Sequence, residues 1–244
     1  SASAYAIDIY RTGWYGGDGA RLIDTIAPSA TLPQTQPACL TDATTELYDC
    51  GNWGLSASWT VPPTAVSGVY IAKLTRPDTD ESSHITFIVR DDASTSEVLF
   101  QTSDTTWQAY NAYGGSDFYL GGNNGRAYKI SYNRPFGTRG TVTARDFYFG
   151  AEYPMVRFLE RNGYDVTYQS GVDTDRFGSL LLNHKVFLSV GHDEYWSGTQ
   201  RANVEAARDA GVHLAFFSGN EVYWRTRYER EAAGPAEAYR TVVS

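Results

Sequence analysis

The stretch Ser189-Val190-Gly191-His192-Asp193-Glu194-Tyr195-Trp196 gathers the densest cluster of titratable and aromatic side chains in the chain. The apolar run Val186-Phe187-Leu188 before it predicts a buried strand. Ser197-Gly198-Thr199-Gln200 after it is a Ser-x-x-Gln capping box, which predicts the first turn of a helix. His192, Asp193 and Glu194 are therefore expected between a strand and a helix. In open α/β sheets ligands bind at that edge.

The second half of the chain alternates strand and helix patterns. Apolar runs at 98–100, 186–190 and 212–217 predict buried strands, and apolar spacing predicts helices near 147–162 and 198–210. Because such alternation forms βαβ units, residues 94–244 are expected to fold as an α/β domain with a mainly parallel sheet. The tail from Arg225 is helix-prone, and the last residues are typical of a strand that is beginning, so we expect a C-terminally truncated fragment.

The first 93 residues have a different pattern. Strand-like runs at 5–10, 55–61, 69–74 and 84–89 are separated by turn-forming residues, and no helix pattern occurs among them. Short strands without helices favour an antiparallel, immunoglobulin-like β-sandwich. The chain is thus predicted to be an α+β protein in two parts, with domains at 1–93 and 94–244.

Composition argues against some classes of function. The net charge of −8 over 244 residues argues against a nucleic-acid partner. No apolar run has the length of a membrane span. Cys39 and Cys50 lie close together in a polar segment and favour a disulfide in an oxidising compartment, with two reduced cytosolic thiols as the alternative. Ser1-Ala2-Ser3-Ala4 is compatible with a removed signal peptide, so we expect a secreted protein.

Polar side chains follow three of the predicted strands. Right-handed crossovers place the carboxyl ends of parallel strands on one side of the sheet. The segments 101–119, 191–196 and 218–224 should therefore meet there. Their candidate functional residues are Tyr110, Tyr113, Tyr119, His192, Asp193, Glu194, Asn220 and Glu221.

The chemistry of this set favours a hard cation. The chain lacks a Gly-x-Ser-x-Gly elbow and a His-Glu-x-x-His zinc motif, and both cysteines are distant in sequence. Carboxylate, amide and phenol oxygens suit ferric iron, Mg²⁺, Mn²⁺ or Ca²⁺. Phenolate ligands need a strong Lewis acid because a phenol pKa is about 10, and this favours ferric iron. A purely structural interpretation stays open: the aromatics pack, His192 bonds a carbonyl, the acids neutralise a helix N-terminus and Asn220 occupies a left-handed turn.

Two blocks resemble motifs of a known family. Gly191-His192-Asp193-Glu194-Tyr195-Trp196-Ser197 and Ser218-Gly219-Asn220-Glu221-Val222-Tyr223-Trp224 are similar to blocks of the N,N-dimethylformamidase large (beta) subunit family. Thr106-Trp107-Gln108-Ala109-Tyr110-Asn111 and Ser131-Tyr132-Asn133-Arg134-Pro135 resemble two further blocks. The resemblance covers roughly 97–225. It also implies a fold similar to the ThuA-like and class I glutamine amidotransferase-like folds, without their catalytic cysteine, and the preceding sandwich resembles that of secreted bacterial relatives.

The resemblance implies an amidohydrolase with one iron ion held by two tyrosines and a glutamate. Carried over by motif, the ligands are Tyr110, Tyr119 and Glu194, with Tyr113 or Tyr128 as alternatives to Tyr119. His192 and Asn220 would lie beside the metal, where His192 moves protons and Asn220 holds the substrate carbonyl. The chain departs from the family in three ways. Asp193 replaces a proline, Glu221 replaces a frequent glycine, and the loop after Tyr119 is short.

Three functions follow from these patterns. The first is a metal-dependent enzyme that hydrolyses a small amide, with additional domains or subunits as partners. The second is a secreted carbohydrate-binding module, in which aromatic side chains stack on a glycan: Trp107, Tyr113, Trp196 and Trp224. The third is a structural domain with a degenerate site.

Overall fold

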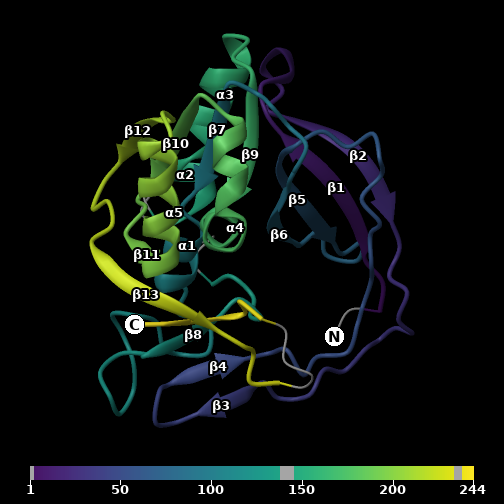
Figure 1. Ribbon diagram of the computed structural model, residues 1–244. Helices are drawn as coiled ribbons and strands as arrows, with labels where there is room; N and C mark the ends of the chain where they lie inside the picture. The colour runs from purple at the N-terminus through teal and green to yellow at the C-terminus, as the bar shows by residue number, and fades with distance from the viewer. Residues whose placement is uncertain (1–2, 138–145, 234–237) are drawn as a thin grey trace.

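A computed structural model describes residues 3–137, 146–233 and 238–244. It shows a mixed α+β fold with one parallel sheet, two antiparallel sheets and one mixed sheet (Figure 1). The predicted α+β class is thereby confirmed. In the described parts of the chain, none of the helices is long and apolar enough to cross a membrane.

The parallel sheet lies at the centre of the second half. Its strands are β7 (Val98–Thr102), β9 (Val166–Ser170), β10 (Val186–Gly191) and β12 (His213–Ser218), in the order β12-β10-β7-β9. All three neighbouring pairs are parallel, and Leu188 of β10 lies opposite Phe100 of β7 and Ala215 of β12. The three strand ends predicted to meet therefore do lie along one edge.

Alternating residues of these strands fill two cores. On one face, Phe100, Leu188 and Val190 pack against α2 (Tyr148–Ala151) and α3 (Tyr153–Arg161). On the other face, Leu99 and Phe187 pack against α5 (Gly198–Asp209) and the 3-10 segment Gly178–Asn183. Successive side chains of a strand point to opposite faces of the sheet. A short run of apolar residues therefore suits a strand that is covered on both faces.

The N-terminal part forms a four-stranded antiparallel sheet. Its strands are β1 (Ala6–Thr12), β2 (Ala20–Ile26), β5 (Gly68–Thr75) and β6 (Ser82–Val89), in the order β2-β1-β5-β6. One face is covered by an irregular segment that contributes Ala57, Trp59 and Ala65. The second sheet that a sandwich requires is not formed by the described residues of this part, so the predicted sandwich is not confirmed.

Three local predictions were wrong. Residues 55–61 form no strand, because a side chain and a loop amide bind their backbone in place of a neighbouring strand: Gln34 donates to the Leu55 carbonyl (3.3 Å) and the Ser29 amide donates to the Ser56 carbonyl (2.9 Å). The polar run Asp173-Thr174-Asp175 predicts a turn from its sequence. It belongs instead to α4 (Gly171–Arg176), which Ser170 and Asp173 cap reciprocally. In its described residues, 225–233 and 238–244, the tail after Arg225 is not helical. It forms β13 (Trp224–Glu229), which pairs with β14 (Thr241–Val243).

Two small sheets complete the molecule at the carboxyl edge of the parallel sheet. The first contains β8 (Lys129–Ser131), β14, β13 and β11 (Tyr195–Ser197). The second is the hairpin of β3 (Leu40–Asp42) and β4 (Leu47–Asp49), which lies beside β8 (Figure 1). The predicted disulfide is confirmed: Cys39 and Cys50 are joined, with the whole hairpin between them.

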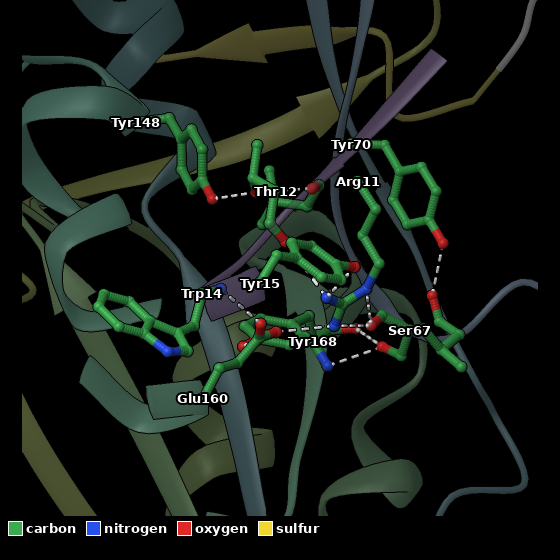
Figure 2. Close-up of polar contacts among 11 residues, drawn as sticks. Arg11, Thr12, Trp14, Tyr15, Ser67, Tyr70, Tyr148, Glu160 and Tyr168 are labelled. Atoms are coloured by element: carbon green, nitrogen blue, oxygen red, sulfur yellow. Dashed lines mark hydrogen bonds and ion pairs between the residues drawn. The ribbon is translucent and has the colours of Figure 1, made fainter. Parts of the chain in front are cut away.

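A polar cluster joins the N-terminal sheet to the α/β part. Arg11 of β1 forms an ion pair with Glu160 of α3 (2.8 Å) and donates to the Ser67 carbonyl, as Figure 2 shows. Glu160 also accepts from the amide of Trp14 (3.0 Å) and from the hydroxyl of Tyr168 in β9 (3.2 Å). The two parts are therefore held together by buried charge as well as by apolar packing.

Candidate functional site

Two backbone segments meet at the carboxyl edge and form the floor of the site. β10 ends at Gly191, whose φ of 98° turns the chain away from the sheet. The segments 191–194 and 219–224 are then joined by three backbone hydrogen bonds, in which Gly219, Val222 and Trp224 donate to Gly191, Asp193 and Glu194 (2.9–3.1 Å). The two blocks quoted from the sequence thus lie side by side, as predicted.

Glu194 is the centre of the cluster. Its side chain is 1% exposed. Its Oε1 accepts a hydrogen bond from the Tyr110 hydroxyl (3.0 Å), and its Oε2 accepts one from the Tyr119 hydroxyl (3.1 Å). Nδ1 of His192 also contacts Oε1. One buried carboxylate therefore gathers two phenols and an imidazole from three separate stretches of the chain.

The two phenols also contact each other. The hydroxyls of Tyr110 and Tyr119 are 3.2 Å apart, and their rings stack with centroids 4.7 Å apart. Tyr110 lies at the C-terminal end of α1 (Asp104–Ala109), and Tyr119 lies in the loop that follows. Burial raises the pKa of both hydroxyls. Both are thus expected to stay protonated at neutral pH unless a cation lowers their pKa.

The alternatives to Tyr119 lie elsewhere. Tyr113 packs edge-to-face on Tyr48, and Tyr128 lies under the guanidinium of Arg126. Neither forms a hydrogen bond with Glu194 in the described residues. Of the three tyrosines considered, Tyr119 is therefore the one whose oxygen the fold brings to Glu194.

Asp193 and Glu221 belong to a second polar cluster, which includes Gln101 and Ser189. Asp193 accepts hydrogen bonds from Gln101 (2.6 Å) and Ser189 (2.8 Å), and Ser189 also donates to Glu221 (3.2 Å). Burial raises the pKa of both carboxyls, and the charge of Asp193 raises that of Glu221 further. In the described residues these acids form no ion pair with a basic side chain. They belong to the carboxyl ends of the sheet strands, separate from the Tyr110–Tyr119–Glu194 cluster.

Asn220 occupies the left-handed turn that the structural interpretation anticipated. Its φ is 50°, its carbonyl accepts from the Tyr223 amide, and its side chain is exposed. In the described part of the chain, this side chain forms no hydrogen bond with the cluster. Its predicted contact with a substrate carbonyl stays a prediction.

Sequence patterns missed Tyr195 as a residue of the site and assigned Trp224 only to glycan stacking. The Tyr195 hydroxyl contacts that of Tyr119, so a third phenol lies behind the cluster. Trp224 packs against Phe118, Tyr119 and Tyr195, with ring centroids 5.7–5.9 Å apart. The signal that could have revealed Tyr195 is its position directly after Glu194 at the start of a predicted helix cap.

Two of the four aromatic side chains expected to stack on a glycan are inaccessible. Trp107 is 2% exposed and Trp196 is 3% exposed, so neither can stack on a sugar. Trp107 instead donates a hydrogen bond to Glu152 (2.8 Å), and Trp196 packs in the core beneath α5. This burial removes the main support for a carbohydrate-binding module.

The oxygen atoms of the cluster fit a small, hard cation. The hydroxyls of Tyr110 and Tyr119 are 3.2 Å apart, and they lie 3.0 Å from Oε1 and 3.1 Å from Oε2 of Glu194, respectively. An octahedral ion with metal–oxygen bonds of about 2.1 Å has oxygen–oxygen edges of about 3 Å. In the described ranges, no group of three or more His, Cys, Asp or Glu side chains is arranged to hold a metal. A metal here would therefore depend on the tyrosine oxygens.

Comparison with known proteins agrees with the sequence resemblance. The pattern of the family described as N,N-dimethylformamidase beta subunit-like, C-terminal, matches residues 6–244. The chain belongs to this family. No curated protein matched the chain in a direct search. The family match extends well beyond 97–225, so the dimethylformamidase-like region includes the N-terminal sheet and the disulfide-closed hairpin.

Proposed function

We propose that this chain carries a metal-dependent amidohydrolase site that hydrolyses the C–N bond of a small amide. The family name supports a dimethylformamidase-like activity. The observation that carries the proposal is the convergence of two phenols on one carboxylate: the Tyr110 and Tyr119 hydroxyls are 3.2 Å apart and lie 3.0 Å from Oε1 and 3.1 Å from Oε2 of Glu194, respectively. Phenolate-rich oxygen ligation favours ferric iron over softer metals. Bound there, such an ion would polarise a carbonyl or lower the pKa of a water molecule.

His192 is the residue that would move protons. Its Nδ1 is engaged with Glu194, which fixes the orientation of the ring and leaves Nε2 to exchange a proton. In the net reaction, water oxygen bonds to the carbonyl carbon, the C–N bond breaks and the amine leaves with a proton. His192 would accept a proton from water and return it to the leaving nitrogen. Asn220 would orient the carbonyl through its exposed side chain.

Substitution of the ligands tests the metal first. We expect about one equivalent of iron and a visible tyrosinate-to-iron absorption band in the parent protein, both lost in Glu194→Gln. Tyr119→Phe should lose or shift the band, because it removes one phenol. Tyr128→Phe is the matched control, since Tyr128 lies under Arg126 and away from Glu194. The proposal fails if iron-supplemented parent protein holds no stoichiometric metal, or if Glu194→Gln retains it.

Small amides are then screened with the iron-loaded parent and with His192→Ala. Release of amine by the parent, reduced by 10²–10⁴-fold in the variant, is the effect expected for loss of general acid–base catalysis. Equal rates in the two proteins would exclude His192 from the reaction.

We also propose the cellular compartment of the protein and its assembly with partners. The disulfide between Cys39 and Cys50 supports residence in an oxidising, extracytoplasmic compartment. The family description supports assembly with further subunits or domains. Fractionation of the source cells and light scattering of the full-length protein test these two points.

A further inference from the structure

The loop that carries Tyr119 is short and irregular. Tyr119 and Leu120 donate their amides to one oxygen of Asp117, at 2.7 Å each, and Asp117 in turn donates its amide to the Leu120 carbonyl. Tyr119 thus lies in a tight turn, and 40% of the residue is exposed. A loop of this kind needs an external support if it is to hold a phenol oxygen in a fixed place.

Glu46 of the hairpin provides that support. Its Oε2 accepts hydrogen bonds from the Ser116 hydroxyl (2.6 Å) and the Gly122 amide (2.7 Å), and its Oε1 accepts one from the Asn124 amide (2.6 Å). Ser116 and Gly122 lie three residues before and three residues after Tyr119. One carboxylate therefore binds both sides of the turn that presents the phenol.

Close packing reinforces the carboxylate. A Cβ at Gly121 would lie 2.2 Å from Oε2 of Glu46, and a Cβ at Gly114 would lie 2.3 Å from the ring of Tyr48. Glycine at these positions is what lets the hairpin approach the loop so closely. The carbonyl of Thr45 also accepts the Tyr128 amide (2.8 Å), which ties the far end of the loop to the same turn.

The hairpin is itself held by a covalent bond. β3 and β4 have three residues each, and isolated two-stranded hairpins are marginal in water. The disulfide from Cys39 to Cys50 closes the hairpin at its open end. Glu46 lies in its turn with a φ of 55°, a conformation that the surrounding contacts must maintain.

We infer that the disulfide-closed hairpin is a positioning element of the active site, in which Glu46 orders the loop at 116–124 and so places the Tyr119 hydroxyl against Glu194. Its consequence for cation binding rests on the proposed function. Glu46 itself lies outside the cluster and touches none of the three proposed ligands in the described contacts. It acts through the backbone of the loop.

Hydrogen exchange of the metal-free protein tests the positioning directly. In Glu46→Gln, amide exchange at 116–124 should rise by about tenfold, because an amide side chain has one acceptor oxygen in place of two. Exchange at 186–197 and the melting temperature should stay close to those of the parent. Asp42→Asn is the matched control, since Asp42 accepts bonds from Thr44 and Thr45 of its own turn. Unchanged exchange in Glu46→Gln, or an equal rise in Asp42→Asn, overturns the inference.

Iron titration followed by absorption then measures the effect on Tyr119. We expect the iron Kd of Glu46→Gln to rise by 10–100-fold, with a shifted tyrosinate band, which is the effect typical of residues that orient metal ligands. A looser loop with an unchanged Kd and band overturns the positioning role. If the parent protein binds no iron, the proposed function fails, and the exchange result alone decides whether Glu46 orders the Tyr119 loop.

Discussion

Glu152 is a buried carboxylate directly behind the site. It is 0% exposed, and its Oε1 accepts from the Ser103 amide (3.0 Å), the Ser103 hydroxyl (2.5 Å) and the Trp107 indole (2.8 Å). A Cβ at Gly191 would lie 3.0 Å from its carboxyl carbon, so it also supports the turn after β10. Burial raises the pKa of Glu152 to about 7, against which these hydrogen bonds act only in part.

This raised pKa predicts how stability depends on pH. The folded protein holds the proton of Glu152 up to about pH 7, whereas the unfolded chain releases it near pH 4.5. The folded state therefore binds more protons between these values, and its stability falls as the pH rises from about 4.5 to 7. Relative to the parent, Glu152→Gln should gain on the order of 3 kcal/mol between pH 5 and pH 8. Urea unfolding of both metal-free proteins measures the difference; equal pH slopes would show that Glu152 is ionised in the folded state.

At the scale of residues, the sequence indicated the proposed metal ligands better than the residues that hold the ligands and nearby turns in place. Glu194 and Tyr110 could be identified because they lie in recognisable blocks. Tyr119 required counting back from Arg134-Pro135, since its own loop is short and has no pattern. Glu46 and Glu152 could not be identified, because their contacts with the site are created by folding across 70 or more positions for Glu46 and 45 or more for Glu152. No local pattern carries that information.

At the scale of elements, apolar runs predicted the parallel strands well. β7 and β10 lie where apolar runs occur, because a strand covered on both faces needs no polar alternation. β12 also lies on an apolar run, although it is an edge strand in which Phe216 and Phe217 are exposed. β2, β3 and β4 were missed. β2 is largely exposed and its apolar and polar residues do not alternate regularly, and the two hairpin strands have three residues each. Their stability comes from partners elsewhere in the chain, which a local pattern cannot show.

The cap of α5 is an element whose contribution can be measured. Ser197 accepts the amide of Gln200 (2.9 Å), as the capping box predicted, and its hydroxyl also donates to the carboxylate of Asp175, which is 8% exposed. Ser197→Ala removes the cap, which costs about 1 kcal/mol. It also leaves Asp175 without that donor, which costs about 1–3 kcal/mol more.

Chemical denaturation of Ser197→Ala should therefore show a loss of about 2–4 kcal/mol. Thr199→Ala is the control, because Thr199 is exposed in the same first turn and alanine is the better helix former. A loss below 1 kcal/mol in Ser197→Ala would mean that Asp175 finds another donor.

At the scale of the whole molecule, the sequence indicated a change of character near residue 93. Strand patterns change to strand–helix alternation there, and the structure changes from an antiparallel to a parallel sheet. What the composition could not show is how the two halves contact each other. The hairpin of the first half reaches the site, and Arg11 reaches α3 at a separation of 149 positions. The proposed site in the second half is thus in contact with a loop that residues of the first half bind.

The Arg11–Glu160 pair predicts that the two halves unfold together. Arg11 is 7% exposed, and its guanidinium binds Glu160, the Ser67 carbonyl and the Tyr15 hydroxyl (Figure 2). Glu160→Ala leaves this buried charge without its carboxylate, a change that costs about 3–5 kcal/mol. Because the substitution weakens the contact between the halves, we expect the single unfolding transition of the parent to separate into two transitions in Glu160→Ala. The N-terminal sheet should open first, seen as faster amide exchange in β1 and β5 than in β10.

Pairing Glu160→Ala with Arg11→Met should restore part of the lost stability, because no buried charge then remains unpaired. A single transition in Glu160→Ala, or no recovery in the double variant, would locate the coupling in the apolar contacts of Val69 with the α/β core instead.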